Sequence, residues 1–295
     1  MDNPFKLPGE FLKGNLHLHT TNSDGEFSPQ QAVKHYEDAG YDFLAITDHN
    51  RLTDTRELSS DKMLMLPGEE LHQGKGELGQ VHHIVAIGMA EHIEIPPTDD
   101  LQQAMDYIAP RCSFAFIAHP YWTSLTYRDI LGCRGSIGVE VFNYTCECGI
   151  GRGDSGPHWD ELLQRGDRLL GFAVDDAHCH YPDSLGGWIM VKARERTAEA
   201  ISQAIIAGEF YASSGPRIED VTLEDGQVTV ECSPCQAVHV ICPAPGCGTT
   251  TRRLARDGGP YTNVTLAVNE SWNPVRIECV DERGRKAWTN PFWSV

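Results

Sequence analysis

Residues 15–25 read NLHLHTTNSDG, and the next apolar run ends in the sequence TDHN, which contains His49. His17 and His19 are two residues apart, so on an extended strand their imidazoles point to the same side and can close on one metal ion. Asp24 lies in the turn that follows. A histidine pair alone is more often solvated or buried in a core, but four candidate ligands near strand ends indicate a metal site.

The composition is that of an ordinary globular protein. The 295 residues are 40% hydrophobic and 22% charged, and they can form one large domain or a large and a small one. No apolar run approaches the roughly 20 residues that cross a bilayer, and the N-terminus does not resemble a signal peptide. We therefore expect a cytoplasmic protein without a membrane partner.

The net charge of −18 argues against a nucleic-acid polymer as partner, because neutralising a phosphate backbone requires clustered Lys and Arg. A small phosphate ester remains compatible with this charge, since bound cations can dominate the local field. Substrate binding is thus expected to involve a small molecule.

The ten cysteines do not indicate a disulfide scaffold in a chain of this length. Cys232 and Cys235 form a C-x-x-C pair that, with Cys242 and Cys247, could be a zinc site. The spacing between the pairs is shorter than in zinc ribbons. Free thiols are favoured, because cysteine is among the residues most often buried.

Strand-like and helix-like segments alternate from residue 14 to about residue 212. The predicted strands are 14–19, 42–48, 62–67, 81–88, 113–118, 136–142, 169–174 and 187–193. The predicted helices are 28–40, 99–109, 158–165 and 197–207, the first beginning with Ser28 as N-cap and Pro29. This α/β order predicts a parallel sheet closed into a barrel.

The pattern changes after Pro216. Apolar residues now alternate with polar ones, as at Val228 and Val230, which indicates half-buried antiparallel strands. Asp225-Gly226 is a hairpin-turn sequence. We therefore predict an α/β domain over residues 1–216 and a small antiparallel β-domain over residues 217–295.

More potential ligands follow the later strands: Glu69, Glu70, His82, His83, His119, Asp175, Asp176 and His178. In a β/α barrel the C-terminal strand ends form the active-site rim, so ligands scattered along the chain converge there. His82 and His83 are adjacent on a strand, so only one of them points inward.

The motifs HLH, NSDG, TDHN, GEEL, HHIVAIG, AHP and DAH occur in this order over about residues 14–217. They resemble the signature of the PHP (polymerase and histidinol phosphatase) family. The resemblance implies a distorted seven-stranded TIM-like barrel with two or three metals at its C-terminal face, and hydrolysis, usually of phosphate esters. Residues 208–216, the β-rich extension and the WTNPF ending resemble a branch that includes predicted phosphoesterases and aryl-carbamate hydrolases.

Carried over by position, the resemblance implies three metal sites. The implied ligands of the first are His17, His19, Glu70 and Asp176. The second site is implied to use His83 and His119, with Glu70 bridging it to the first. The third site is implied to use Asp24, His49 and His178. The implied catalytic residues are Glu70, Asp176 and His178. Asp24 replaces a frequent histidine, which predicts a weak third site, and Asp175 is an extra carboxylate that either supports a ligand or replaces one.

Mixed imidazole and carboxylate ligands suit Mn²⁺, Zn²⁺ or Fe²⁺. Two such ions lower the pKa of a bridging water and stabilise charge in the transition state, which favours a phosphoesterase using a metal-bridged hydroxide. The alternatives are a carboxylic or carbamate ester hydrolase with the same centre, and a non-catalytic regulatory domain.

Candidate substrate contacts are Arg152 and Arg217 for a phosphate, and Tyr121 with Trp122 for an aromatic group. His72, His92, His158 and His239 have no motif context.

Overall fold

The computed structural model describes residues 2–244, 248–253, 258–269 and 271–293. The strands of the first part are β1 (Glu10–Asn15), β2 (Phe43–Ile46), β3 (Leu64–Gln73), β4 (His82–Ile87), β5 (Phe114–Ile117), β6 (Ser136–Asn143), β7 (Leu170–Val174), β8 (Trp188–Ala193) and β9 (Phe210–Ser213). Its helices are α1 (Pro29–Asp38), α2 (Leu101–Ile108), α3 (Tyr127–Ile130), α4 (Tyr144–Ile150), α5 (Gly156–Gln164) and α6 (Ala198–Ala207), with 3₁₀ turns at Pro4–Lys6 and Ala109–Arg111.

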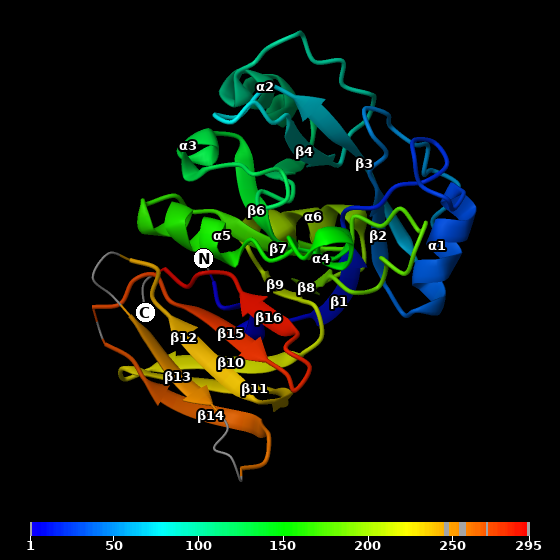
Figure 1. Ribbon diagram of the computed structural model, residues 1–295. Helices are drawn as coiled ribbons and strands as arrows, with labels where there is room; N and C mark the ends of the chain where they lie inside the picture. Colours follow the sequence, from blue (N-terminus) through cyan, green and yellow to red (C-terminus); the bar gives the residue numbers. More distant parts are fainter. Residues whose placement is uncertain (1, 245–247, 254–257, 270, 294–295) are drawn as a thin grey trace.

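The remaining strands are antiparallel and form the C-terminal part of the molecule. They are β10 (Ile218–Glu224), β11 (Gln227–Cys235), β12 (Ala237–Ile241), β13 (Thr249–Arg253), β14 (Tyr261–Ala267), β15 (Arg276–Val280) and β16 (Lys286–Thr289). Figure 1 shows these strands packed together on one side, below the α/β part in this view.

The protein is a mixed α/β structure built on one large sheet. Thirteen strands join in the order β13-β12-β15-β16-β9-β8-β1-β2-β3-β4-β5-β6-β7, and β10, β11 and β14 form a second sheet. The strands from β1 to β3 are parallel, as are those from β5 to β7. At the edge of the sheet, β7 packs against β8 and β9.

The prediction of a parallel sheet is wrong for β4 and β8. β4 runs antiparallel to both β3 and β5, and β8 runs antiparallel to β1 and β9. The connection from β3 to β4 covers only residues 74–81 and contains no helix. A parallel pair needs a crossover of a dozen residues or more, so this short connection returns the chain antiparallel.

The start of α1 follows the sequence prediction. Ser28 is the N-cap, its hydroxyl accepts from the backbone N–H of Gln31, and the Gln31 side chain bonds back to the Ser28 backbone. Pro29 occupies the first turn, where its missing N–H is not needed. The buried face of the helix, with Val33 and Tyr36, packs over the end of the sheet that carries the histidines.

The C-terminal strands enclose a second hydrophobic core, which Tyr211 of β9 also joins. β10 and β11 are joined at Asp225-Gly226, where φ is 49° and 69°, which confirms the predicted hairpin turn. β16 pairs with β9, so the large sheet runs continuously from one part into the other. The boundary after residue 216 stays a prediction.

Among the helices that the structure describes, none has the length and apolar character needed to span a bilayer.

Candidate metal centre

The HLH segment lies just beyond β1, which ends at Asn15, rather than within the predicted strand 14–19. The backbone N–H of His19 donates to Ala177, and His17 accepts from the Asp176 N–H, so the segment lies extended beside the end of β7. The two imidazoles therefore point to the same side, with their Nε2 atoms 3.2 Å apart.

The other candidate ligands reach the same edge of the sheet by different routes. His49, His119 and Asp176 lie just past the ends of β2, β5 and β7, and the last two adopt positive φ of 27° and 56°. Such backbone conformations are uncommon for residues other than glycine and cluster at functional sites. Glu70 belongs to β3, and His83 to the start of β4, which reaches this edge because β4 is antiparallel.

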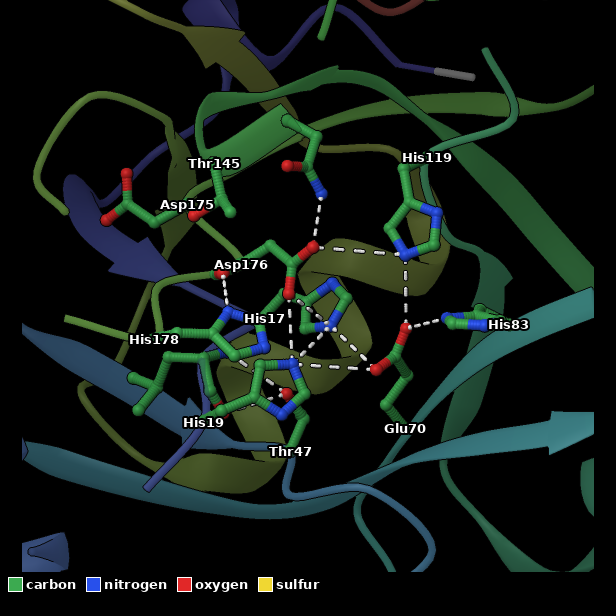
Figure 2. Close-up of polar contacts among 12 residues, drawn as sticks. His17, His19, Thr47, Glu70, His83, His119, Thr145, Asp175, Asp176 and His178 are labelled. Carbon is green, nitrogen blue, oxygen red and sulfur yellow. Dashed lines mark hydrogen bonds and ion pairs between the residues drawn. The ribbon is translucent and has the colours of Figure 1, made fainter. Parts of the chain in front are cut away.

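The inner group consists of His17, His19 and Asp176. Asp176 Oδ1 is 2.9 Å from His19 Nε2 and 3.2 Å from His17 Nε2. All three side chains are buried, and Figure 2 shows them directed toward one another and toward Glu70. Their ligand atoms can therefore face a single ion.

Glu70 lies between the inner group and a second pair, His83 and His119. Its Oε1 is 2.8 Å from His83 Nδ1 and 3.1 Å from His119 Nε2. Its Oε2 is 3.5 Å from the Nε2 atoms of both His17 and His19. Glu70 would therefore be shared between an ion held by the inner group and an ion held by His83 and His119.

The outer group consists of Asp24, His49 and His178. Asp24 Oδ2 is 3.4 Å from His49 Nε2, and Asp24 Oδ1 is 3.5 Å from His178 Nε2. The Asp24 side chain is 54% exposed, whereas that of Glu70 is 1% exposed. The outer group is thus the end of the centre where water competes most for a cation.

The residues fit a divalent metal because their free lone pairs converge. His17 Nδ1 bonds to Glu140 Oε1 at 2.7 Å, which leaves His17 Nε2 as an acceptor facing the inner group. His19 Nδ1 and His72 Nε2 are buried without a hydrogen-bond partner. Buried polar atoms are normally paired, and a cation would satisfy such atoms.

Neighbouring charges shift the pKa values of two candidate ligands, Glu70 and His17. Burial acts to raise the pKa of Glu70, yet His17 and His119 hold that pKa well below its ordinary value. Burial acts to lower the pKa of His17, but the carboxylates of Asp176, Glu70 and Glu140 raise it well above the ordinary value. At His17, therefore, the surrounding carboxylates stabilise positive charge.

Three residues without a sequence prediction hold the ligands in place. Glu140 Oε2 accepts from the backbone N–H of His119 at 2.7 Å and from Asn143 Nδ2 at 2.9 Å. Asn143 Nδ2 also donates to Asp176 Oδ2 at 3.0 Å, and Thr123 Oγ1 is 3.1 Å from His119 Nδ1. A lone carboxylate in the apolar run IGVEVFN was a signal for Glu140.

His72 is a further residue that the motifs did not indicate. Its Nε2 is 3.5 Å from Glu70 Oε2, and its ring stacks on that of His83 with centroids 3.9 Å apart. His72 follows Glu70 by two residues on β3, so both side chains face the same side of the sheet. That spacing was the available signal.

Asp175 is not a ligand replacement. Its carboxylate accepts from Tyr36 Oη at 2.6 Å and from the backbone N–H groups of Leu185, Gly186 and Gly187 at 2.7–2.8 Å. Burial raises the pKa of Asp175 to about 6. Figure 2 shows this carboxylate pointing away from the inner group, so it orders the loop behind the centre.

A cavity of about 440 Å³ opens over the candidate ligands. Trp122, Ile150 and Tyr181 give it an apolar and partly exposed rim. The residues that line it are Asp24, His49, Glu70, His83, His119, Trp122, Thr145, Cys146, Gly149, Ile150, Asp176, His178, His180 and Tyr181. Among these described lining residues there is no Lys or Arg.

Three of the four predicted substrate contacts, Arg152, Arg217 and Tyr121, are absent from this lining. Arg152 donates to Ser124 Oγ at 3.2 Å, and its guanidinium lies 5.2 Å from the ring centroid of Tyr121. Arg217 is exposed and pairs with Glu219 at 3.3 Å. The structure therefore brings neither arginine to the cavity wall, and Trp122 lines it in place of its neighbour Tyr121.

The structure is similar to that of a two-domain protein containing a predicted PHP-like metal-dependent phosphoesterase from Bacteroides vulgatus. The similarity covers 99% of both chains, with a TM-score of 0.52 and 17% sequence identity. The chain has a PHP-like fold. This confirms, at the level of fold, the resemblance that the motifs indicated. The PHP-like fold explains why ligands from separate strands meet at one edge.

Two further known proteins are similar to parts of this chain. An amidohydrolase from Chromobacterium violaceum is 15% identical, with a TM-score of 0.47 over 67% of this chain and 96% of that one. An uncharacterized protein of Methanocaldococcus jannaschii is 28% identical over 143 residues, 46% of this chain. The chain spans about half the length of that curated relative, 54%. No protein-family model matches the chain.

Proposed function

We propose that the protein is a metal-dependent hydrolase that cleaves a small phosphate ester, with the centre at the rim of a distorted seven-stranded barrel. The observation that carries this proposal is the convergence of the inner group, Glu70, the second pair and the outer group beneath one cavity. A cavity of about 440 Å³ suits a small molecule rather than a polymer.

The distances between ligand atoms divide the proposed ligands into three sites. His17, His19 and Asp176 hold one ion, and His83 and His119 hold a second. Glu70 is shared between these two sites, and the outer group holds a third ion. When bound, such ions supply Lewis-acid stabilisation and activate water near neutral pH. Donors of imidazole and carboxylate type suit Mn²⁺, Zn²⁺ or Fe²⁺.

The protein's own residues provide position and polarity. Asn143 fixes the orientation of Asp176, and Glu140 fixes that of His17. His178 Nδ1 donates to the backbone oxygen of Asp176 at 2.9 Å, which leaves His178 Nε2 free to face the cavity as a ligand or a proton acceptor. These contacts hold the ligand atoms in place before substrate arrives.

One observation favours a second candidate, hydrolysis of an aryl carboxylic or carbamate ester. The described cavity lining offers Trp122, Ile150 and Tyr181 but no cationic side chain. An aromatic group packs well on such a rim, whereas a phosphate dianion there depends on the metal ions alone for its positive partner.

A substrate panel distinguishes the candidates. Purified protein is loaded with Mn²⁺, Zn²⁺ or Fe²⁺, its metal content is measured by ICP-MS, and p-nitrophenyl phosphate is compared with p-nitrophenyl acetate and 1-naphthyl N-methylcarbamate. We expect turnover of the phosphate ester that EDTA abolishes and added metal restores. Faster turnover of the neutral esters favours the second candidate. Bound metal without turnover of any ester overturns the hydrolase proposal and favours a non-catalytic regulatory domain.

A further inference from the structure

Three cysteines meet in the C-terminal β-structure, which contributes no proposed ligand to the metal centre. Cys232 and Cys235 belong to β11 in the three-stranded sheet, and Cys279 belongs to β15 in the large sheet. They are 3%, 0% and 0% exposed. These three residues form the thiol cluster, which lies in the core between the two sheets.

The thiol cluster differs from the grouping expected from sequence. Cys279 joins the C-x-x-C pair in place of Cys242, and Cys247 lies outside the described residues. Cys232, Cys235 and Cys279 are free thiols, as the sequence favoured. The third member comes from a strand that is distant in sequence, so no local spacing pointed to it.

A bulge in β11 brings the first two thiols to the same side. Residues three apart in a regular strand face opposite sides of the sheet. Between Glu231 and Cys235 the pairing of β11 with β14 shifts register, and exposed Pro234 lies in this interval. The irregularity re-aims one side chain, as β-bulges do, so Cys232 and Cys235 are both buried on the core side.

The three sulfur atoms lie within 4.8 Å of one another. A Zn–S bond is about 2.3 Å long, so two sulfurs on one tetrahedral zinc ion are about 3.8 Å apart. The three thiols thus need only small side-chain adjustments to share one ion. Cys232 Sγ is also 3.8 Å from the backbone oxygen of Tyr261, a potential additional donor.

The three thiols also influence one another's protonation. The sulfurs of Cys235 and Cys279 lower the pKa of Cys232, and the pKa values of Cys235 and Cys279 are raised in return. The three thiols therefore interact directly. A soft cation in the same place would replace the thiol protons and bind all three sulfurs as thiolates.

We propose that Cys232, Cys235 and Cys279 bind one thiophilic d¹⁰ metal ion, Zn²⁺ or Cu⁺, that ties the two sheets of the C-terminal part together. Binding exchanges thiol protons for the ion and requires no oxidant or reductant. Soft thiolate ligands select such ions, whereas the imidazole and carboxylate ligands of the rim accept harder ones. Three sulfurs alone suit Cu⁺, and a tetrahedral Zn²⁺ takes a fourth donor such as the Tyr261 carbonyl or water.

A disulfide is the competing chemistry of a C-x-x-C pair. It would join two of the three sulfurs and leave the third unused in the same pocket. A single ion uses all three, and it also connects β11 to β15, which a bond between Cys232 and Cys235 would not do. The test therefore distinguishes a disulfide between Cys232 and Cys235 from a bound ion.

The test uses the full chain, purified with a reductant and freed of metal by a chelator. Co²⁺ or Cd²⁺ is added first, because their thiolate charge-transfer bands report sulfur ligands and remain silent for the imidazoles and carboxylates of the rim. We expect the band to reach the intensity of one thiolate-bound ion per chain, in addition to any ion that the rim holds. Competition by Zn²⁺, or by Cu⁺ under anaerobic conditions, then identifies the preferred ion.

The variants are Cys279→Ser and Cys235→Ser, with Cys112→Ser as the matched control, since Cys112 is a half-buried thiol outside the cluster. We expect either cluster variant to lose the band and one equivalent of thiophilic ion by ICP-MS, whereas the control keeps both. Because a cluster variant can also unfold, wild-type protein is treated in parallel with a thiol reagent at increasing urea, where the buried thiols of metal-free protein become reactive and bound ion should protect three of them.

Absence of the band and of protection in folded wild-type protein overturns the proposal and leaves three inert buried thiols. A mass loss of two hydrogens, with no ion bound under reducing conditions, overturns it in favour of a disulfide. Neither result bears on the rim, whose metal content and esterase or phosphatase activity are measured on the same samples.

Discussion

Glu140→Gln tests whether the carboxylate behind His17 sets the affinity of the metal centre. Glu140 is fully buried and faces only hydrogen-bond donors. One oxygen bonds to His17 Nδ1 at 2.7 Å, and the other accepts from the His119 backbone N–H at 2.7 Å and from Asn143 Nδ2 at 2.9 Å. Glutamine preserves size and shape but turns one acceptor into a donor.

The magnitude follows from those contacts. If the glutamine NH₂ group faces His119 and Asn143, it meets the His119 backbone N–H and the Asn143 side-chain NH₂, so three donor groups lie together without an acceptor. If it faces His17, the imidazole must change tautomer and loses its acceptor at Nε2. Loss of a hydrogen bond to a charged group costs about 1.5–3 kcal/mol. Loss of a carboxylate behind a histidine ligand typically weakens metal binding by about 10–100-fold, which corresponds to about 1.4–2.7 kcal/mol.

The assay is a titration of Mn²⁺ or Zn²⁺ into metal-free protein by calorimetry, together with thermal unfolding of the same samples. Glu69→Gln is the matched control, because Glu69 is an equally buried carboxylate whose oxygens lie 2.9 and 3.0 Å from His92 Nδ1, outside the centre. We expect the tightest site to weaken about 10–100-fold in E140Q and to remain unchanged in E69Q.

The result that refutes this reasoning is metal affinity in E140Q equal to that of wild type, with the protein folded. A fall in melting temperature without a change in affinity would assign Glu140 a purely structural role. Equal weakening in E69Q would show that any buried carboxylate on this side of the sheet matters, rather than the bond to His17.

The remaining predictions concern the other ligands and the rim. Glu70→Gln should lose bound metal, measured by ICP-MS, and nearly all hydrolytic activity, because the Glu70 carboxylate serves two sites. Glu69→Gln should reduce metal content and activity only slightly. The reverse ranking would mean that the wrong carboxylate of GEEL is assigned. Metal titration should show two tight sites and one weaker site, and Asp24→Asn should abolish only the weaker one; three equally tight sites would contradict this expectation. Changing Arg152 and Arg217 together to Ala should leave kcat/KM and metal content unchanged, because neither lines the cavity; a marked rise in KM for phosphate esters would show that one of them reaches the substrate.

The local sequence was enough to place most elements and the candidate ligands. The capping pattern at Ser28, the apolar runs that become β2 and β5, and the turn at Asp225 follow from residues close together in the chain. The two-residue spacing of His17 and His19 likewise encodes their common direction. Such features depend on backbone periodicity and capping, which act over a few residues.

The tertiary structure decided what depends on strand partners and packing. The antiparallel direction of β4 puts His83 at the same edge as the ends of the parallel strands. Strand pairing places Glu140 behind His17 and turns Asp175 toward a loop, although each is a plain carboxylate in sequence. It also sets Cys279 beside a C-x-x-C pair more than forty residues away. These contacts join residues far apart in the chain, and neither period nor spacing encodes them, because they arise only when the sheet fixes which strands are neighbours and in what register.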